Sequence, residues 1–199
     1  MGNLTLFDII ASAVIASLLL ITVHNSSARM NETLCTSGSD VAVQTHLVNI
    51  VRIIEKDFRR IGYCAIPSKI PDQTVSVVAA GAHNISFLTD VNSAGNVDTL
   101  TYDVGSPSAM MSTPNPRDFL LNRYVNGTTP KGMSIGLTRF DFKYFNSTGD
   151  SLALPIADLR QIYTLQLTVA LESTHPYDSQ YQYAAWRQLR LKVRNIDQR

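Results

Sequence analysis

The chain has 199 residues and a formal net charge of +1, with 17 Lys and Arg residues against 16 Asp and Glu residues. This balance leaves no basic surface of the kind that nucleic-acid binding requires, so nucleic acid is not an expected partner. Only 17% of the residues are charged. A polar surface built from Ser, Thr and Asn rather than from charges favours an extracytoplasmic location.

The most apolar part of the chain is LTLFDIIASAVIASLLLITV (Leu4 to Val23), which contains a single charge, Asp8. About 20 apolar residues in a helix span the ~30 Å hydrocarbon core of a bilayer. No Lys or Arg stands before this run, unlike the basic start of a secretory signal peptide. We therefore expect residues 1–23 to form a transmembrane helix. An acid inside such a helix is costly, which makes Asp8 a candidate functional residue.

Residues 24–62 combine a polar segment with a second helical pattern. Asp40 is a good N-cap for this second helix, and Gly62 a good end. The segment Thr36–Ser39 is either a break or the solvated middle of one long helix. Gly38 costs roughly 1 kcal/mol relative to Ala inside a helix, so the local signals favour a break. The apolar residues recur at spacings of three and four: Val43, Leu47, Ile50, Ile54, Phe58 and Ile61.

Residues 63–199 change from a helical to an alternating pattern, which predicts β-strands. About 175 residues follow the anchor, enough for one sizeable domain. Strands with one apolar face belong to an antiparallel sheet covered on one side, and the amphipathic helix is the expected cover. The predicted fold class is therefore α+β. The expected strands are 83–89, 99–104, 140–144, 163–171 and 189–193.

The stretch DVNSAGNVD (Asp90 to Asp98) places acids and Asn at alternating positions with a Gly sixth, as in a calcium loop. A calcium loop needs an acid where Ala94 stands and a bidentate Glu where Thr101 stands. We therefore interpret the stretch as a hairpin turn. The sequence lacks the G-x-S-x-G, H-E-x-x-H and phosphate-loop motifs, and we expect neither an enzyme, a metal site nor a cofactor.

The two cysteines, Cys35 and Cys64, can form an intrachain disulfide only if the helix between them is interrupted. In one unbroken helix they would lie about 43 Å apart, whereas a disulfide needs Cα atoms within ~7 Å. An intrachain bridge therefore requires the chain to turn back near residues 36–39. Otherwise the thiols are free or pair between subunits. Exported cysteines seldom stay unpaired, so both geometries remain open.

Several segments, in order, resemble the type IV pilin and type II secretion pseudopilin superfamily, especially PilW-type minor pilins and GspJ-type pseudopilins. LTLFDII resembles the family's F-T-L-I-E-L-L start, with Asp8 in place of the Glu. EKDFRRIGYC (Glu55 to Cys64) resembles L-x-x-D-I-R-x-A-G-Y. ISFLTDVNSAGNVDTLTYDV resembles a family hairpin, and the register from Leu4 to Asp57 fits one long helix. The chain differs in having Asp instead of Glu and in placing Asn3 between Gly2 and Leu4.

The resemblance implies a structural subunit, a minor one, of a type IV pilus or pseudopilus-like filament whose partners are other subunits. Such proteins are held in the inner membrane and end in a periplasmic or extracellular filament. Asp8 would neutralise the N-terminal ammonium of a neighbour, with Leu4 and Phe7 beside it in the assembly segment. Ser12 and Ala16 have the small-xxx-small spacing that lets membrane helices approach closely.

Two alternatives use other features of the sequence. One is a membrane-tethered extracytoplasmic binding domain that does not polymerise. The other is a eukaryotic type II membrane glycoprotein, because the chain contains six N-x-S/T sequons. A chain rich in Asn, Ser and Thr also produces such sequons without glycosylation. The sequons are at Asn3, Asn25, Asn31, Asn84, Asn126 and Asn146.

Overall fold

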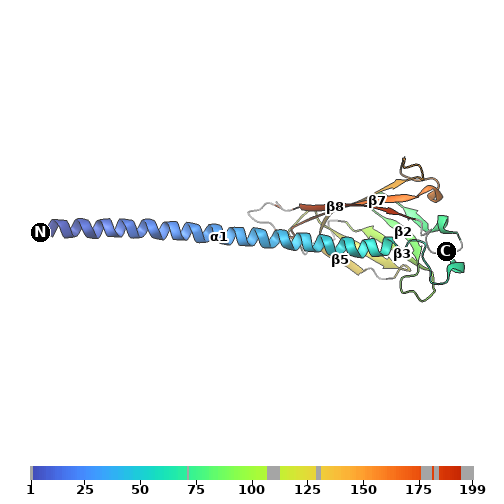
Figure 1. Ribbon diagram of the computed structural model, residues 1–199, viewed down its shortest axis with the longest axis horizontal. Coiled ribbons are helices and arrows are strands. Elements are labelled where there is room, and N and C mark those ends of the chain that lie inside the picture. The colour runs from blue at the N-terminus through green and yellow to red at the C-terminus, as the bar shows by residue number, and fades with distance from the viewer. Residues whose placement is uncertain are drawn as a thin grey trace. The chain divides into compact units, whose positions relative to one another are not determined.

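The structure, a computed structural model, describes residues 2–70, 72–106, 113–128, 131–175, 181 and 184–193. The chain divides into two compact units, Met1–Val41 and Ala42–Arg199. One long helix, α1 (Gly2–Phe58), begins in the first unit and ends in the second. An antiparallel sheet makes up most of the second unit, so the fold is α+β as expected (Figure 1).

Helix α1 continues without a break through residues 36–39, so the expected interruption there is wrong. Asp40 accordingly lies inside the helix rather than at its start. A break would leave four N–H and four C=O groups without helical partners, which outweighs roughly 1 kcal/mol for Gly38. The Thr36 hydroxyl is satisfied within the helix, since Thr36 Oγ1 donates to the Thr33 carbonyl oxygen at 3.0 Å. Residues 24–58 belong to α1, so the expected amphipathic segment is the later part of this helix and not a helix of its own.

The end of α1 is close to the position that the sequence indicated. The helix ends at Phe58, and hydrogen-bonded turns carry the chain on to Gly62. Gly62 has a φ of +74°, a conformation that favours glycine. Its N–H donates to the Leu88 carbonyl oxygen at 2.9 Å, which joins the end of this turn to the sheet.

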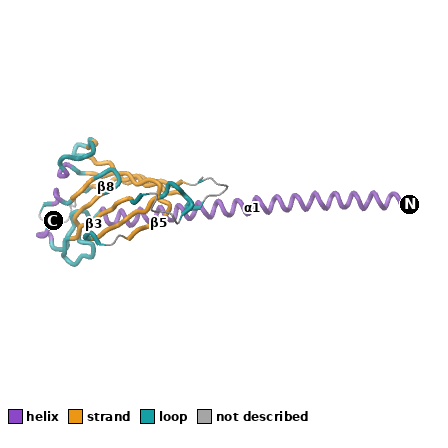
Figure 2. Tube along the Cα trace, turned by 180° about the vertical axis from the view of Figure 1, so that it is seen from behind, coloured by secondary structure: helices purple, strands orange, loops and turns teal. Residues whose placement is uncertain are grey.

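In the part of the chain that the structure describes, the sheet has eight strands in the order β1-β2-β3-β4-β5-β7-β8, with β6 paired to β5. All of the pairs are antiparallel. The strands, orange in Figure 2, are β1 (Val77–Ala80), β2 (Ile85–Thr89), β3 (Asp98–Val104), β4 (Phe119–Val125), β5 (Lys131–Phe145), β6 (Ser151–Leu152), β7 (Thr164–Glu172) and β8 (Ala184–Lys192). Short 3-10 helices lie at Pro67–Lys69, Gln73–Val75 and Leu159–Gln161.

The long strand β5 changes partners along its length, pairing first with β4 and then with β7. Leu137 pairs both with Phe119 of β4 and with Leu171 of β7, and the residue before it, Gly136, has a φ of +73°. A Cβ at this position would lie 2.1 Å from the Glu172 carbonyl oxygen, so only glycine fits. The pairing with β7 shifts between Leu137 and Arg139, a bulge that bends the strand.

Each strand expected from alternation is present, in β2, β3, β5, β7 and β8. The turn-rich stretch between β2 and β3 is a hairpin connection as expected, because Thr89 pairs with Asp98. The sequence did not predict β1, β4 or β6. The expected surface excursion 105–116 lies largely outside the described residues.

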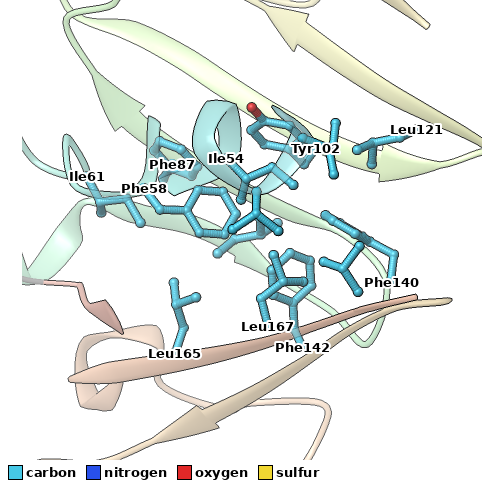
Figure 3. Packing of buried hydrophobic residues seen from close by; sticks show 14 of the residues in the cluster. Ile54, Phe58, Ile61, Phe87, Tyr102, Leu121, Phe140, Phe142, Leu165 and Leu167 are labelled. Carbon is cyan, nitrogen blue, oxygen red and sulfur yellow. The ribbon is translucent and has the colours of Figure 1, made fainter. Parts of the chain in front are cut away.

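One buried cluster contains side chains from the last turns of α1 and from the sheet. Phe58 is fully buried, and its ring lies 5.5 Å from the rings of Phe87 and Tyr102 (Figure 3). The ring of Phe142 lies 6.0 Å from that of Phe58. All six residues of the predicted stripe are buried, and Val51, which the spacing did not include, is buried with them.

Candidate functional site

The N-terminal part of α1 exposes its apolar side chains on all sides. Every large apolar residue from Leu6 to Val23 is more than half exposed, for example Phe7 at 68% and Leu20 at 74%. A helix that is apolar all round needs lipid or other helices around it. By length and composition, α1 can cross a membrane, although an N-terminal signal sequence shares both properties.

Four small or polar residues interrupt this apolar surface along one face of α1. Thr5, Asp8, Ser12 and Ala16 are three or four residues apart, so they lie on the same side of the helix. Asp8, Ser12 and Ala16 are exposed. This arrangement brings together three of the residues that the sequence assigned to assembly.

The other two residues of that set, Leu4 and Phe7, also lie in α1. The side chain of Leu4 is outside the part of the chain that the structure describes. Phe7 is exposed. A change from residue 7 to residue 8 turns about 100° around the helix, so Phe7 lies beside the polar face rather than within it.

Hydroxyl groups in the apolar segment bond to the helix backbone. Ser12 Oγ donates to the Asp8 carbonyl oxygen at 2.7 Å, and Ser17 Oγ donates to that of Ala13 at 2.8 Å. Thr22 Oγ1 donates to the Leu19 carbonyl oxygen at 2.8 Å. Because these donors are satisfied within the helix, they cost little in hydrocarbon. Asp8 is then the charged residue in this segment, and its side chain is exposed.

A polar cluster at the end of α1 was not predicted from the sequence. Asp57 Oδ2 accepts hydrogen bonds from Tyr102 Oη at 2.6 Å and from Arg123 Nε at 2.8 Å. The side chains of Asp57 and Arg123 are only 13% and 18% exposed. Burial and the neighbouring Asp57 carboxylate raise the pKa of Tyr102 far above its usual range, so Tyr102 remains a proton donor. The cluster joins α1 to β3 and β4.

Asp90, the first residue of the calcium-like stretch, is turned toward backbone N–H groups. Its Oδ2 accepts from Gly95 N at 2.7 Å and Ala65 N at 3.1 Å, and its Oδ1 accepts from Ala94 N at 3.1 Å. Burial raises the pKa of this carboxyl, but these hydrogen bonds outweigh it and hold the pKa below its usual value. The carboxylate therefore holds the β2–β3 turn together, and its oxygens are already engaged.

The described residues contain no group of three His, Cys, Asp or Glu side chains arranged to hold a metal ion. Both cysteines are free thiols: Cys35 is exposed and Cys64 is buried. The turn near residues 36–39 that an intrachain disulfide requires is absent from α1.

Two of the sequon asparagines use their side chains inside turns. Asn126 Oδ1 accepts from Thr99 N at 2.8 Å, and Asn126 Nδ2 donates to Asp98 Oδ1 at 2.7 Å. Asn146 Oδ1 accepts from the N–H groups of Thr148 and Asp150 at 3.0 and 2.8 Å. These asparagines therefore have a structural use that explains their presence without glycosylation.

Comparison with known proteins finds no matching family model, no matching curated protein and no matching solved structure.

Proposed function

We propose that this protein is a minor structural subunit of a filament of the type IV pilus or pseudopilus kind. The observation that carries the proposal is the exposed apolar segment of α1 with Asp8, Ser12 and Ala16 along one face. The segment has the length to lie in a membrane and the apolar surface to pack among equivalent helices. The resemblance of the chain's segments to pilins and pseudopilins supports the same function.

In this proposal Asp8 accepts a charge from a neighbouring subunit during assembly. The partner group is the N-terminal ammonium of the next helix. In a low-dielectric surrounding, the attraction between the two charges is much stronger than in water. Ser12 and Ala16 are small enough for two helix backbones to approach along the face that contains Asp8.

The second unit is the part that the filament would present. In this proposal the last turns of α1 cover one face of the sheet with their apolar side. The burial of Leu47, Ile54 and Phe58 supports this arrangement. The protein would be stored in the inner membrane with this unit on the extracytoplasmic side, and later lie in a periplasmic or extracellular filament. Its role is assembly and surface presentation, without catalysis.

The test compares membrane and filament fractions of cells that express Asp8 variants. We expect Asp8→Ala to leave the amount of protein in the membrane unchanged but to deplete it from sheared filaments, because the ion pair is lost. Asp8→Glu should be incorporated, since the carboxylate is kept. Glu32→Ala is the matched control: Glu32 is an exposed acid of α1 outside the apolar segment, and its loss should have no effect.

Incorporation of Asp8→Ala at the level of the parent protein would contradict the role of Asp8. Absence of the parent protein itself from sheared material would favour the alternative, a membrane-tethered binding domain that does not polymerise. Mass spectrometry of the N-terminus in both fractions would show whether the residues before Leu4 are retained.

A further inference from the structure

The outer face of β5, β7 and β8 contains a hollow of about 640 Å³. Its position follows from the strand register. Asp141 of β5 pairs with Thr168 of β7, which pairs with Gln188 of β8. Two residues further along β7, Ala170 pairs with Arg139 of β5 and with Trp186 of β8. Strands β7 and β8, which carry two of the three residues in each row, lie next to each other in Figure 1.

Small residues form the hollow between larger neighbours. Ala170 and Ala184 lie beside Trp186, and Ala82 comes from the turn between β1 and β2. Trp186 is 65% exposed, although indole rings are usually largely buried. The Trp186 side chain therefore presents exposed aromatic surface to the hollow.

The turn between β1 and β2 is attached firmly to β5 at the other side of the hollow. Phe142 N donates to the Ala82 carbonyl oxygen at 2.8 Å, and Tyr144 Oη donates to the Gly81 carbonyl oxygen at 2.9 Å. His83 Nδ1 lies 3.1 Å from the Phe140 carbonyl oxygen. This side of the lining is therefore held in place before a ligand arrives, which reduces the entropy cost of binding.

Asp141 is the acid of this lining, and it contacts two of the basic side chains, Arg139 and His83. Arg139 Nε lies 2.5 Å from Asp141 Oδ2, and His83 Nδ1 lies 3.0 Å from Asp141 Oδ1. Among the described residues, Lys143 is the cation of the lining without a carboxylate partner. A single such cation is too few for a polyanion, whose binding depends on many cation–phosphate contacts.

The remaining polar groups are neutral and include both donors and acceptors. Gln188 and Gln166 have side-chain amides, and Thr168 has a hydroxyl. Gln166 Oε1 already accepts from Arg190 at 3.1 Å, whereas the Gln188 side chain has no hydrogen-bond partner among the described residues. A ligand with several hydroxyl groups would satisfy such a lining better than an apolar chain.

We propose that this hollow binds a neutral oligosaccharide. Trp186 would stack against the C–H face of one sugar ring, because the faces of aromatic rings carry negative charge density that attracts polarised C–H groups. Gln188, Thr168 and the Asp141–Arg139 pair would hydrogen-bond the hydroxyls at the ring edge. A second hollow of about 310 Å³ shares His83, Arg139 and Asp141, which leaves room for an oligosaccharide to extend beyond a single sugar ring. The proposal is independent of filament assembly.

Trp186 is the one tryptophan of the chain, so its fluorescence reports on this hollow directly. The full-length protein is titrated with cellohexaose, maltohexaose, chitohexaose and mannohexaose in a zwitterionic detergent that has no sugar headgroup. We expect a saturable change in the emission with at least one of them and a dissociation constant on the order of 1 mM or lower.

Ala170→Leu keeps the fluorophore but fills the hollow, and we expect it to weaken binding by about tenfold or more, since the added side chain occupies ligand space. Thr168→Val, which removes one hydroxyl with little change of shape, covers the case in which Ala170→Leu fails to fold. It should weaken binding as well. Arg187→Gln is the control, because alternation places residue 187 on the opposite face of β8, and it should bind like the parent protein.

No saturable change with any of the oligosaccharides would overturn the proposal. So would an equal response of the parent protein and a correctly folded Ala170→Leu or Thr168→Val variant. Binding of oligothymidylate with a steep salt dependence, in place of the sugars, would assign the hollow to nucleic acid instead.

Discussion

Asp57 and Arg123 form an ion pair between the last turn of α1 and strand β4, with 2.8 Å between Asp57 Oδ2 and Arg123 Nε. The same carboxylate oxygen accepts the Tyr102 hydroxyl from β3. Both charges are mostly buried and each has a partner, as buried charges require. The cluster therefore sets the position of the end of the helix relative to two neighbouring strands.

Breaking this pair should destabilise the second unit. We expect Asp57→Ala to lower the free energy of unfolding by about 3 kcal/mol, because it leaves Arg123 and Tyr102 without their acceptor. A double-mutant cycle with Arg123→Ala should give a coupling energy of about 1–3 kcal/mol. Denaturant unfolding of the full chain, followed by Trp186 fluorescence, measures both.

The control for this cycle is the exposed ion pair between Glu55 and Arg59, which are four residues apart in sequence. Glu55→Ala should change the stability by less than about 0.5 kcal/mol, as is usual for exposed pairs at this spacing. Equal effects of Asp57→Ala and Glu55→Ala would mean that the Asp57 cluster is no more than a surface ion pair.

Asp90 should make the stability of the β2–β3 turn sensitive to acid. Its folded-state pKa is depressed by hydrogen bonds from Ala65, Gly95 and Ala94, which outweigh the effect of burial. The stabilisation is therefore fully present above the unfolded-state pKa of about 3.9 and is lost as pH falls through the lower folded-state pKa. We expect Asp90→Asn to be less stable than the parent at neutral pH and to approach it in acid.

Asn92→Ala separates this titration from simple damage to the turn. Asn92 Oδ1 accepts from Ala94 N at 3.0 Å in the same loop but carries no charge. Its loss should lower the stability by a similar amount at every pH. Urea unfolding at a series of pH values measures both variants, and a parallel shift for Asp90→Asn would contradict the linkage.

Periodicity in the sequence predicted those helical and strand segments whose apolar residues recur regularly on one face. Leu47, Ile54 and Phe58 recur at helical spacing and are buried, and the alternation around Phe140 and Phe142 marks β5. β4 was missed because FLLNRYV does not alternate, and its pairing with β5 shifts between Phe119 and Leu121. A bulge breaks the period-two pattern on which strand prediction depends.

The candidate sites differ in how far the sequence could reveal them. Asp8 could be found because a charge within an apolar run is visible locally. Arg123 is 66 residues from Asp57, and neither residue has a local signal for its partner. The hollow beside Trp186 depends on which residues of β5, β7 and β8 come into register, which sequence patterns do not determine.

Gly38 and Gly136 should respond in opposite ways to replacement by alanine. A Cβ at Gly38 has nothing within 4 Å, so alanine should stabilise α1 locally by roughly 1 kcal/mol and slow amide exchange there about fivefold. Gly136→Ala should destabilise the sheet, because its φ is positive and the Glu172 carbonyl oxygen blocks the Cβ. Hydrogen exchange by mass spectrometry detects both effects, and no slowing in the Gly38 variant would point to a helix interrupted in solution.

The cysteines test the continuity of α1 more directly. Cys35 is exposed, whereas Cys64 is buried with its Sγ 4.0 Å from Asp90 Oδ2. A maleimide should therefore label Cys35 in the native protein and label Cys64 on the order of 100-fold more slowly, because Cys64 needs a local opening. Cys35→Ser should abolish the fast labelling, which peptide mapping by mass spectrometry measures. Since a disulfide needs Cα atoms within about 7 Å, a Cys35–Cys64 crosslinked peptide from unreduced monomer would require α1 to turn back near Gly38, contrary to the continuous helix.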